Sequence, residues 1–283
     1  MRVHLDCFPC FLRQTIIALR LGTKDELLQE RVLKSILPEI QITDISMPPA
    51  YTTTFIHRKI RQLLGKDPFR ELKHEYNKIA LGLYPSLKTM VRESQDPLWT
   101  ATRLAIAGNV IDFGIFTSVD VDIEGTIRKA INNPLAVDEF DIFKKAISDT
   151  DTILYLADNA GEIVFDRILI ETLISAGKKV TVVVKGSPVI NDATLDDALE
   201  SGLTGICEVV DNGSDAVGTI SPWTSSVFQE LFRNAELILS KGQGNFETLT
   251  GIQKNIFFLF QSKCDVVSKE LGLSNGSMLL KKS

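Results

Sequence analysis

Four polar segments in the second half of the chain contain the residue types that bind metal ions and phosphate groups. They are DNAGE (158–162), KGSPVINDAT (185–194), DNGSDAVGT (211–219) and SKGQGNFETL (240–249). The first two could present Asp158, Asn159 and Asp192 to one point, and oxygen ligands of this kind suit a divalent cation such as Mg²⁺ or Mn²⁺. Lys241 could supply a positive charge to a bound anion, and Gly161 would let backbone N–H groups approach that anion closely. A metal, a lysine and amide donors around one cavity describe a phosphate site.

Each segment alone also has a simpler interpretation, because Asp and Asn cap helices and Gly ends strands for local reasons. Two familiar nucleotide-binding motifs do not fit. The chain contains no G-x-x-x-x-G-K-[ST] sequence, which argues against a P-loop. The segment GQGNFE (242–247) begins like a dinucleotide-binding G-x-G-x-x-G motif but has Glu247 in place of the third glycine. The metal and phosphate prediction therefore depends on the four segments taken together.

Each polar segment follows a short run that is rich in Val, Ile and Leu. These runs lie at 152–157, 179–184, 206–210 and 235–240, and a fifth lies at 256–260. Helix-like segments at about 163–175, 193–200 and 224–233 separate most of them. Alternation of strand and helix is typical of a parallel sheet, and continuous apolar runs indicate strands buried on both faces. Ligands bind outside the carboxyl ends of such strands, so all four polar segments are predicted to lie at one edge.

The first half of the chain has the apolar spacing of α-helices. Helical patterns cover 10–21, 25–37, Pro48-Pro49 to Gly65, Pro68 to about Tyr84-Pro85, and a segment that begins at Asp96-Pro97. We therefore predict a mainly helical N-terminal region at 1–147 and an α/β core at 148–283. The end of the chain, SNGSMLLKKS (274–283), is predicted to be exposed, and so are His57 and His74, which have charged neighbours on their helices.

The composition is that of an ordinary globular protein, with 283 residues, 44% of them hydrophobic, and a formal net charge of −5. An acidic chain lacks the basic footprint of generic nucleic-acid binding. No apolar run approaches the ~20 residues that span a bilayer, and the N-terminus lacks the apolar region of a signal peptide. We therefore expect a soluble, cytoplasmic protein with no nucleic-acid or membrane partner; the oligomeric state is left open.

Three of the four cysteines form a second group of interest. Cys7 and Cys10 form a C-x-x-C pair just before a helix, and Cys264 follows the last predicted strand. No βαβ unit surrounds the pair, which argues against a thioredoxin-like motif. Three interpretations stay open: ordinary buried thiols, a Cys7–Cys10–Cys264 cluster near the cavity, or a redox pair.

Several separated motifs, in this order, resemble the metal-dependent damage-control phosphatase family, long catalogued as domain of unknown function 89. They are DCFPC (6–10), AGNVIDFG (107–114), DNAGE, KGSPVINDAT and KGQGNFETL (241–249). The N-terminal C-x-x-C is similar to that of the stand-alone microbial branch. This resemblance covers most of the chain and implies a Rossmann-like three-layer α/β/α core, with a mainly parallel sheet and a helical N-terminal domain.

The resemblance also implies hydrolysis of small phosphorylated metabolites with a divalent metal, such as Mn, Ni, Co or Mg. Asp158, Asn159 and Asp192 match the metal ligands, and the two aspartates are the catalytic candidates. The remaining residues that match polar positions of the family's cavity, including the phosphate contacts, are Lys241, Asn245, Asn109 and Asp112.

The mechanism leaves two alternatives for the nucleophile, a metal-activated water or Asp158 itself. Glu162 could act as a base, but a glutamate at a helix start more often interacts with the helix dipole. Two other functions compete with the phosphatase. One is a non-catalytic protein that binds a metal or a metabolite in the same cavity. The other is a methyltransferase, for which the first polar segment has a single glycine where a glycine-rich loop is usual.

Overall fold

The structure is a computed structural model and describes residues 1–110 and 123–283. Within these residues seven strands form one sheet, in the order β1-β7-β6-β5-β2-β3-β4. All neighbours are parallel except the antiparallel pair β6 and β7. The strands are β1 (Val137–Asp138), β2 (Thr152–Leu156), β3 (Lys179–Val184), β4 (Glu208–Asp211), β5 (Leu237–Lys241), β6 (Ile256–Gln261) and β7 (Met278–Lys282).

The strand order reverses between β2 and β5. From β2 the chain moves through β3 to β4 in one direction, whereas β5 and β6 continue in the other. In open α/β sheets the loops that leave such a switch point diverge and open a crevice at the carboxyl ends of the strands. The segment that follows β2 begins at Ala157 and continues with Asp158, and the segment that follows β5 begins at Gly242. The topology therefore places the two segments at the crevice.

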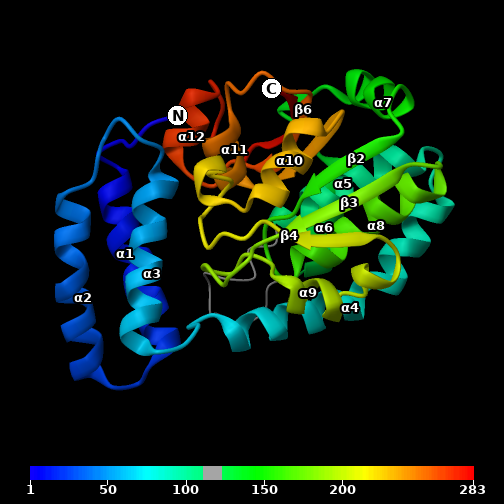
Figure 1. Cartoon of the computed structure of the whole chain (residues 1–283). Helices are drawn as coiled ribbons and strands as arrows, with labels where there is room; N and C mark the ends of the chain where they lie inside the picture. Colours follow the sequence, from blue (N-terminus) through cyan, green and yellow to red (C-terminus); the bar gives the residue numbers. More distant parts are fainter. Residues whose placement is uncertain (111–122) are drawn as a thin grey trace.

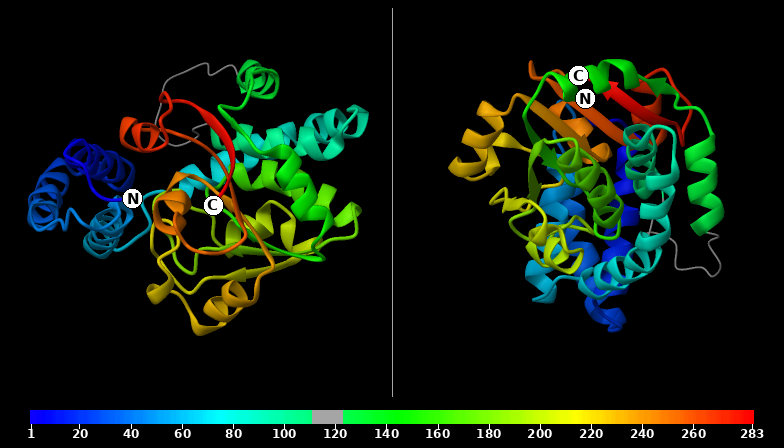
Figure 2. Two further views of the ribbon diagram at one scale, coloured as in Figure 1. Left: turned by 90° about the horizontal axis from the view of Figure 1, so that it is seen from above. Right: turned by 90° about the vertical axis from the view of Figure 1, so that its right-hand side faces the viewer.

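Helices cover both faces of the sheet (Figures 1 and 2). One core cluster joins the sheet to α4, α5 and α8, and the other joins it to α10, α11 and α12. This is the predicted three-layer α/β/α arrangement with a mainly parallel sheet, so the predicted fold class is confirmed. The helices of this part are α4 (Arg70–Glu93), α5 (Pro97–Val110), α6 (Ile123–Asn132), α7 (Phe140–Ser148), α8 (Glu162–Ser175), α9 (Leu195–Glu200), α10 (Ser226–Asn234), α11 (Gln243–Leu249) and α12 (Asp265–Glu270).

Three N-terminal helices form a separate bundle beside the α/β part (Figure 1). They are α1 (Cys7–Gly22), α2 (Glu26–Gln41) and α3 (Pro49–Leu64), and they enclose their own apolar core. Ile190 and Val266 of the α/β part pack against this core, so the bundle rests on the carboxyl edge of the sheet. By contrast, α4 and α5 pack on the sheet side, against α8. The helices of region 1–147 thus contribute to both parts.

Three expectations of the sequence analysis are wrong, one about exposure and two about the ends of helices. The C-terminal segment, expected to be exposed, contains β7, in which Met278, Leu279 and Leu280 are buried between β6 and β1. Pro38 does not end α2, which runs to Gln41, and Pro85 does not end α4, which runs to Glu93. In α4 the residues that follow Pro85 include buried positions, and their packing offsets the hydrogen bond that proline cannot donate.

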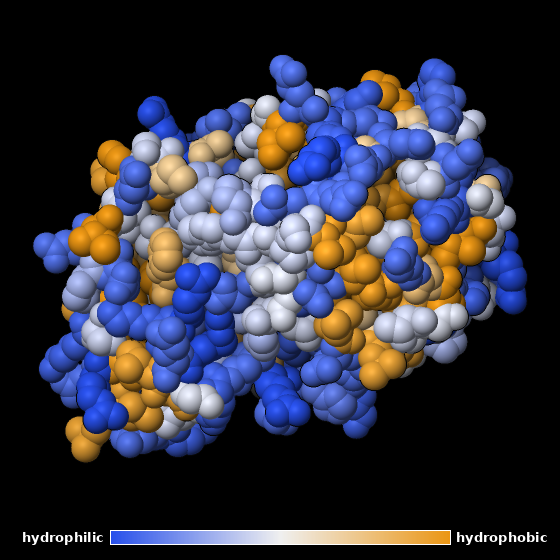
Figure 3. All heavy atoms as spheres, in the orientation of Figure 1, coloured by the Kyte–Doolittle hydropathy of each residue, from blue (hydrophilic) through white to orange (hydrophobic). Residues whose placement is uncertain are grey.

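The surface carries scattered apolar side chains rather than a membrane-spanning element. On the face shown in Figure 3, polar side chains cover most of the molecule and apolar side chains gather mainly over the α/β part. Within the described ranges, no helix is both long and apolar enough to cross a membrane.

Candidate active site

A cavity of about 520 Å³ lies between the bundle and the carboxyl edge of the sheet. One wall comes from α1 and α3 of the bundle, and the opposite wall comes from the segments that follow β2, β3, β4, β5 and β6. This volume is within the usual range for small-molecule sites. The predicted metal ligands Asp158, Asn159 and Asp192 all line it.

Backbone contacts between two loops bring these three residues together. Asn159 and Asp192 form an isolated antiparallel bridge. The backbone N–H of Ala160 donates to the carbonyl oxygen of Asn191 at 2.9 Å, and that of Ala193 donates to the carbonyl oxygen of Asp158 at 2.8 Å. The loops after β2 and β3 are therefore joined where their polar side chains lie, and the predicted juxtaposition of Asp158, Asn159 and Asp192 is present.

The carboxylate of Asp158 lies at the floor of the cavity among other charged groups. Its Oδ2 atom accepts hydrogen bonds from Asn159 Nδ2 at 2.7 Å and from Asn109 Nδ2 at 3.3 Å. Withdrawal from solvent, together with the negative charges of Glu162 and Asp192, raises the pKa of Asp158 well above its ordinary value. Buried carboxylates whose negative charge is not balanced by nearby cations favour the binding of a metal cation.

The amide of Asn159 is oriented by two carboxylates. Its Nδ2 atom donates to Asp158 Oδ2 at 2.7 Å and to Glu162 Oε2 at 3.0 Å. Both hydrogens of the amide are thereby engaged, and within the described part of the chain Oδ1 accepts no hydrogen bond. Asn159 Oδ1, the side-chain atom that could bind a cation, is thus not used in a hydrogen bond to the described residues.

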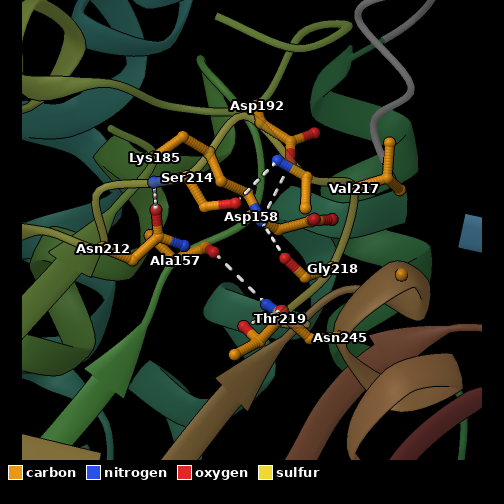
Figure 4. Close-up of polar contacts among 12 residues, drawn as sticks. Ala157, Asp158, Lys185, Asp192, Asn212, Ser214, Val217, Gly218, Thr219 and Asn245 are labelled. Atoms are coloured by element: carbon orange, nitrogen blue, oxygen red, sulfur yellow. Dashed lines mark hydrogen bonds and ion pairs between the residues drawn. The ribbon is translucent and has the colours of Figure 1, made fainter. Parts of the chain in front are cut away.

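Asp192 has one oxygen without a hydrogen-bond partner. Its side chain is 7% exposed, and Oδ2 lies 3.3 Å from Lys185 Nζ, an ion pair whose geometry does not form a hydrogen bond. Lys185 Nζ instead donates to the carbonyl oxygen of Gly218 (Figure 4). Burial raises the pKa of Asp192 although the charge of Lys185 opposes this rise. Asp192 Oδ2 thus has one ion-pair partner and no aligned hydrogen bond, which leaves it able to accept a further partner.

Lys241 is placed beneath the cavity rather than in its wall. The side chain is fully buried, and Nζ contacts Glu162 Oε1 at 2.6 Å, Asp166 Oδ1 at 2.5 Å and the carbonyl oxygen of Ala105 at 2.8 Å. The two carboxylates raise the pKa of Lys241 despite its burial. All three ammonium hydrogens have partners, so in this arrangement none is directed at an anion in the cavity. Glu162 is likewise fully paired and 1% exposed, which fits a supporting role better than that of a base.

Two side chains of α4 contact both metal-ligand loops. Asn77 Oδ1 accepts from the backbone N–H of Gly161 at 2.7 Å, and Asn77 Nδ2 donates to Asp197 Oδ1 at 2.9 Å. Lys73 Nζ forms an ion pair with Asp197 at 2.8 Å and donates to the carbonyl oxygen of Asp192 at 3.4 Å. The N–H of Gly161, a predicted phosphate donor, is therefore already engaged by the protein.

The other predicted contacts differ in their positions. Asn109 lines the cavity, donates to Asp158 and Glu162, and accepts from the backbone N–H of Gln261 at 3.0 Å. Asn245 is 1% exposed, and its amide donates to the carbonyl oxygen of Lys241 at 2.8 Å and accepts from Thr219. It also donates to the carbonyl oxygen of Ala157 at 3.4 Å (Figure 4). Asn245 thus holds two loops together below the surface of the cavity. Asp112 lies outside the described residues.

Cys7, Cys10 and Cys264 all line the cavity, Cys7 and Cys10 from α1 and Cys264 from the start of α12. In the described ranges, no group of three or more His, Cys, Asp or Glu side chains is arranged to hold a metal ion, and all four cysteines are free thiols. Burial raises the pKa of Cys7, which disfavours the thiolate needed for metal binding or disulfide exchange. The geometry is that of three free thiols that line one cavity, two from the bundle and one from the α/β part.

His57 is a cavity residue that the sequence analysis placed wrongly. It was expected at the surface, but it is 2% exposed, lines the cavity and packs its ring 5.9 Å from that of Phe69. Burial lowers its pKa to about 3, so the imidazole is neutral. His74, by contrast, has a side chain that is 69% exposed, as expected.

The family described as "Damage-control phosphatase ARMT1-like domain" matches residues 3–279, nearly the whole chain. The chain belongs to this family. The match confirms the resemblance drawn from the separated motifs, and it includes both the helical bundle and the α/β part.

Relatives over the full length are named accordingly. A damage-control phosphatase of Archaeoglobus fulgidus is 32% identical, over 99% of this chain and 99% of its own length. A damage-control phosphatase of Pyrococcus horikoshii is also 32% identical, over 99% of this chain and 97% of its own length. The crystal structure of a DUF89 family protein from Pyrococcus horikoshii superimposes with a TM-score of 0.92 at 31% identity, covering 100% of this chain and 99% of that one. Family membership therefore supports a phosphatase of damaged metabolites.

Proposed function

We propose that the protein is a metal-dependent phosphatase that hydrolyses small phosphorylated metabolites, such as sugar phosphates, nucleotides or damaged phosphometabolites. The observation that carries the proposal is the convergence of Asp158, Asn159 and Asp192 in one cavity, with Asp192 Oδ2 buried and without a hydrogen-bond partner. Family membership favours the same reaction class.

The donor set fits a divalent cation. Two carboxylates and the free oxygen of an Asn amide are the ligands preferred by hard or borderline cations, and Mn²⁺, Ni²⁺, Co²⁺ and Mg²⁺ are our candidates. A bound cation supplies Lewis-acid stabilisation of charge on a phosphate oxygen. Asp158, Asn159 and Asp192 would hold it, and the pairing of Asn159 Nδ2 with Asp158 and Glu162 keeps Asn159 Oδ1 available. Asp192 Oδ2, which has an ion pair with Lys185 but no hydrogen bond, would gain a second partner.

Lys263 is our candidate for the phosphate contact that the sequence analysis assigned to Lys241. It lines the cavity, and its charge lowers the pKa of Asp158, which means that the ammonium lies near that carboxylate. Its ammonium has no hydrogen bond or ion pair to any residue in the ranges 1–110 and 123–283. An unpaired cation beside the proposed metal ligands can bind the phosphate oxygens that the metal does not contact.

Substitution of the ligands by their amides tests the proposal. We expect wild-type protein to release phosphate from a panel of sugar phosphates and nucleotides in at least one of Mn²⁺, Co²⁺, Ni²⁺ and Mg²⁺, and to lose this activity in EDTA. Asp158→Asn and Asp192→Asn are expected to lower kcat/KM by at least ~100-fold, because each removes a charge that holds the metal. Asp149→Asn, at an exposed surface ion pair with Lys145, is the matched control.

The outcomes separate the competing functions. Metal-dependent turnover that is unchanged in Asp192→Asn would contradict the proposed site. Metal binding by wild type without release of phosphate from any ester would favour the non-catalytic alternative. A wild-type activity that is insensitive to EDTA would contradict metal dependence.

A further inference from the structure

The bundle wall of the cavity contains two polar atoms without partners. His57 Nε2 on α3 and Gln14 Oε1 on α1 are both buried, and neither has a hydrogen-bond partner among the described residues. Both residues line the same cavity as Asp158 and Asp192. A buried polar atom of this kind costs on the order of 1–3 kcal/mol unless water or a ligand satisfies it. Two of them on one wall indicate a site where a ligand supplies the partners.

The neighbouring contacts fix what each atom can offer. Gln14 Nε2 donates to Cys10 Sγ at 3.4 Å, which orients the amide and leaves Oε1 as a hydrogen-bond acceptor. Burial keeps the imidazole of His57 neutral, so the ring has one donor and one acceptor nitrogen. Neither atom carries a formal charge. The charged residues that line the bundle side, Asp6 and Arg13, are exposed, whereas these two atoms are buried. The two atoms therefore suit an uncharged polar group, and a hydroxyl can donate to Gln14 and hydrogen-bond to His57 in either direction.

The position of this wall relative to the metal ligands gives it a role. Asp158, Asn159 and Asp192 lie on the sheet side, whereas Gln14 and His57 lie on the bundle side. A volume of about 520 Å³ is far more than one phosphate group requires, given that a water molecule takes roughly 30 Å³. A phosphate bound at the sheet edge would leave room for the rest of the substrate against the bundle.

We propose that Gln14 and His57 form a leaving-group subsite that binds a hydroxyl of the substrate's organic part. The inference rests on the proposed phosphatase function, since the phosphate end must bind at the sheet edge. It makes the bundle a determinant of specificity, separate from the metal ligands. It also gives a role to a neutral histidine at a buried position that an apolar residue could fill.

A matched pair of esters tests the subsite. Sorbitol 6-phosphate and hexyl phosphate have the same number of carbons and differ in the hydroxyls of the leaving group. We expect wild type to prefer the sorbitol ester, measured both as the ratio of kcat/KM values and, by calorimetry, as the ratio of Kd values. His57→Phe and Gln14→Leu are each expected to reduce both ratios by about 3- to 10-fold, the effect of one hydrogen bond.

The variants are chosen to preserve the fold. Phenylalanine keeps the ring contact of His57 with Phe69, and Gln14→Leu gives up only the exposed hydrogen bond of Gln14 Nε2 to Cys10 Sγ, so both variants should lose little stability. His74→Phe is the control, because His74 is exposed and does not line the cavity. Unfolding temperatures of the three variants would be measured beside the ratios.

The failure of the subsite and the failure of the enzyme can be told apart. Unchanged ratios in both His57→Phe and Gln14→Leu, or a wild type without preference for the sorbitol ester in turnover or binding, would overturn the subsite. That result would mean that ordered water, and not a substrate hydroxyl, satisfies His57 Nε2 and Gln14 Oε1. Absence of turnover for every ester with every metal would count against the phosphatase, and the Kd ratio would still decide the subsite.

Discussion

The side-chain oxygen of Asn77 accepts a hydrogen bond from the backbone N–H of Gly161 at 2.7 Å. Gly161 follows two of the proposed metal ligands by two and three residues, and Asn77 belongs to α4, in the helical half of the chain. The neighbouring turn of α4 carries Lys73, which reaches the loop of the third ligand through Asp197 and the carbonyl oxygen of Asp192. Helix α4 therefore fixes the spacing of the two loops that carry the ligands.

Substitution of Asn77 is expected to weaken metal binding. Asn77→Ala removes the partner of the Gly161 N–H and one of the partners of the Asp197 carboxylate, which keeps Lys73 and Thr194, so both loops lose a fixed contact. Supporting residues around metal ligands typically contribute 10- to 100-fold to affinity, and we expect a loss of about that size in Mn²⁺ affinity, measured by calorimetry or electron paramagnetic resonance.

Ala80→Gly separates this effect from a general weakening of α4. Ala80 is fully buried on the same helix, and glycine in a helix interior costs about 0.5–1 kcal/mol without touching either loop. Ala80→Gly is expected to lower the unfolding temperature and to keep wild-type Mn²⁺ affinity. Equal loss of affinity in the two variants would show that α4 acts only through stability.

The two lysines near the site are expected to respond differently. Lys241→Met removes the cation between Glu162 and Asp166 and leaves two buried carboxylates without it. Breaking a buried ion pair in this way costs about 3–5 kcal/mol, so we expect a large drop in the free energy of unfolding, measured with urea. A Lys241→Met protein as stable as wild type would contradict the buried network.

Lys263→Gln is expected to leave stability nearly unchanged, because its ammonium makes no hydrogen bond or ion pair within the described part of the chain. It should instead raise the KM for phosphate esters by about tenfold, the effect of losing one charge-assisted hydrogen bond of ~1.5 kcal/mol. Steady-state kinetics with the active metal measures this. A wild-type KM would remove Lys263 from the phosphate contacts.

The positions of Asp158, Asn159 and Asp192 could be predicted because they follow from local patterns. Apolar runs marked β2 and β3, and the rule for parallel sheets places the residues after those strands at one edge. No further information was needed to predict that the three side chains approach one another. The same reasoning misplaced Lys241. Its position at a strand end does not reveal that Glu162 and Asp166, on successive turns of α8, lie close to its ammonium.

Other features depend on contacts between distant segments. Strand β7 is short, ends in two lysines and is buried by its pairing with β6 and β1 and by the helices on both faces of the sheet, so its own sequence indicated an exposed tail. His57 lies on α3, whose buried face includes Thr52, Thr53 and Thr54. A polar buried face conceals the apolar periodicity by which a cavity-facing helix is usually detected.

The burial of His57 gives stability a defined pH dependence. Its pKa is about 3 in the folded protein and near 6.5 in the unfolded chain, so below pH 6.5 the unfolded state binds a proton that the folded state does not. The contribution of His57 to the free energy of unfolding is fully present above pH 6.5. It is lost as the pH falls toward 3, by about 1.4 kcal/mol per pH unit. Other groups titrate in this range, so the difference between wild type and His57→Phe isolates it.

We expect this difference in the free energy of unfolding to move by about 2 kcal/mol, in favour of His57→Phe, between pH 6.5 and pH 5. Urea unfolding at several pH values measures it. A difference that does not depend on pH would mean that His57 is protonated in the folded protein or is not buried.

Gly242 tests how closely the backbone of one loop approaches the ligand of another. Its φ is +80°, and a Cβ atom at this position would lie 1.9 Å from Asp158 Oδ2. Gly242→Ala must therefore displace the Asp158 carboxylate as well as strain the backbone. Gly177 has a φ of +82° but would place its Cβ with no atom within 4 Å, so Gly177→Ala has the backbone strain alone.

We expect Gly177→Ala to lose roughly 1 kcal/mol of stability from backbone strain. Gly242 combines its φ of +80° with a ψ of 158°, a conformation essentially confined to glycine, so Gly242→Ala should lose more, about 1–3 kcal/mol. Only Gly242→Ala should also lose metal affinity and phosphatase activity, each by at least tenfold, because a displacement of about 1 Å at a catalytic group can cost ~100-fold in rate. Unfolding temperature, Mn²⁺ affinity and kcat/KM would be measured for both. Gly242→Ala could instead match Gly177→Ala in all three measurements. Metal binding and catalysis would then not depend on the position of the Asp158 carboxylate beside Gly242, and the assignment of Asp158 as a metal ligand would fail.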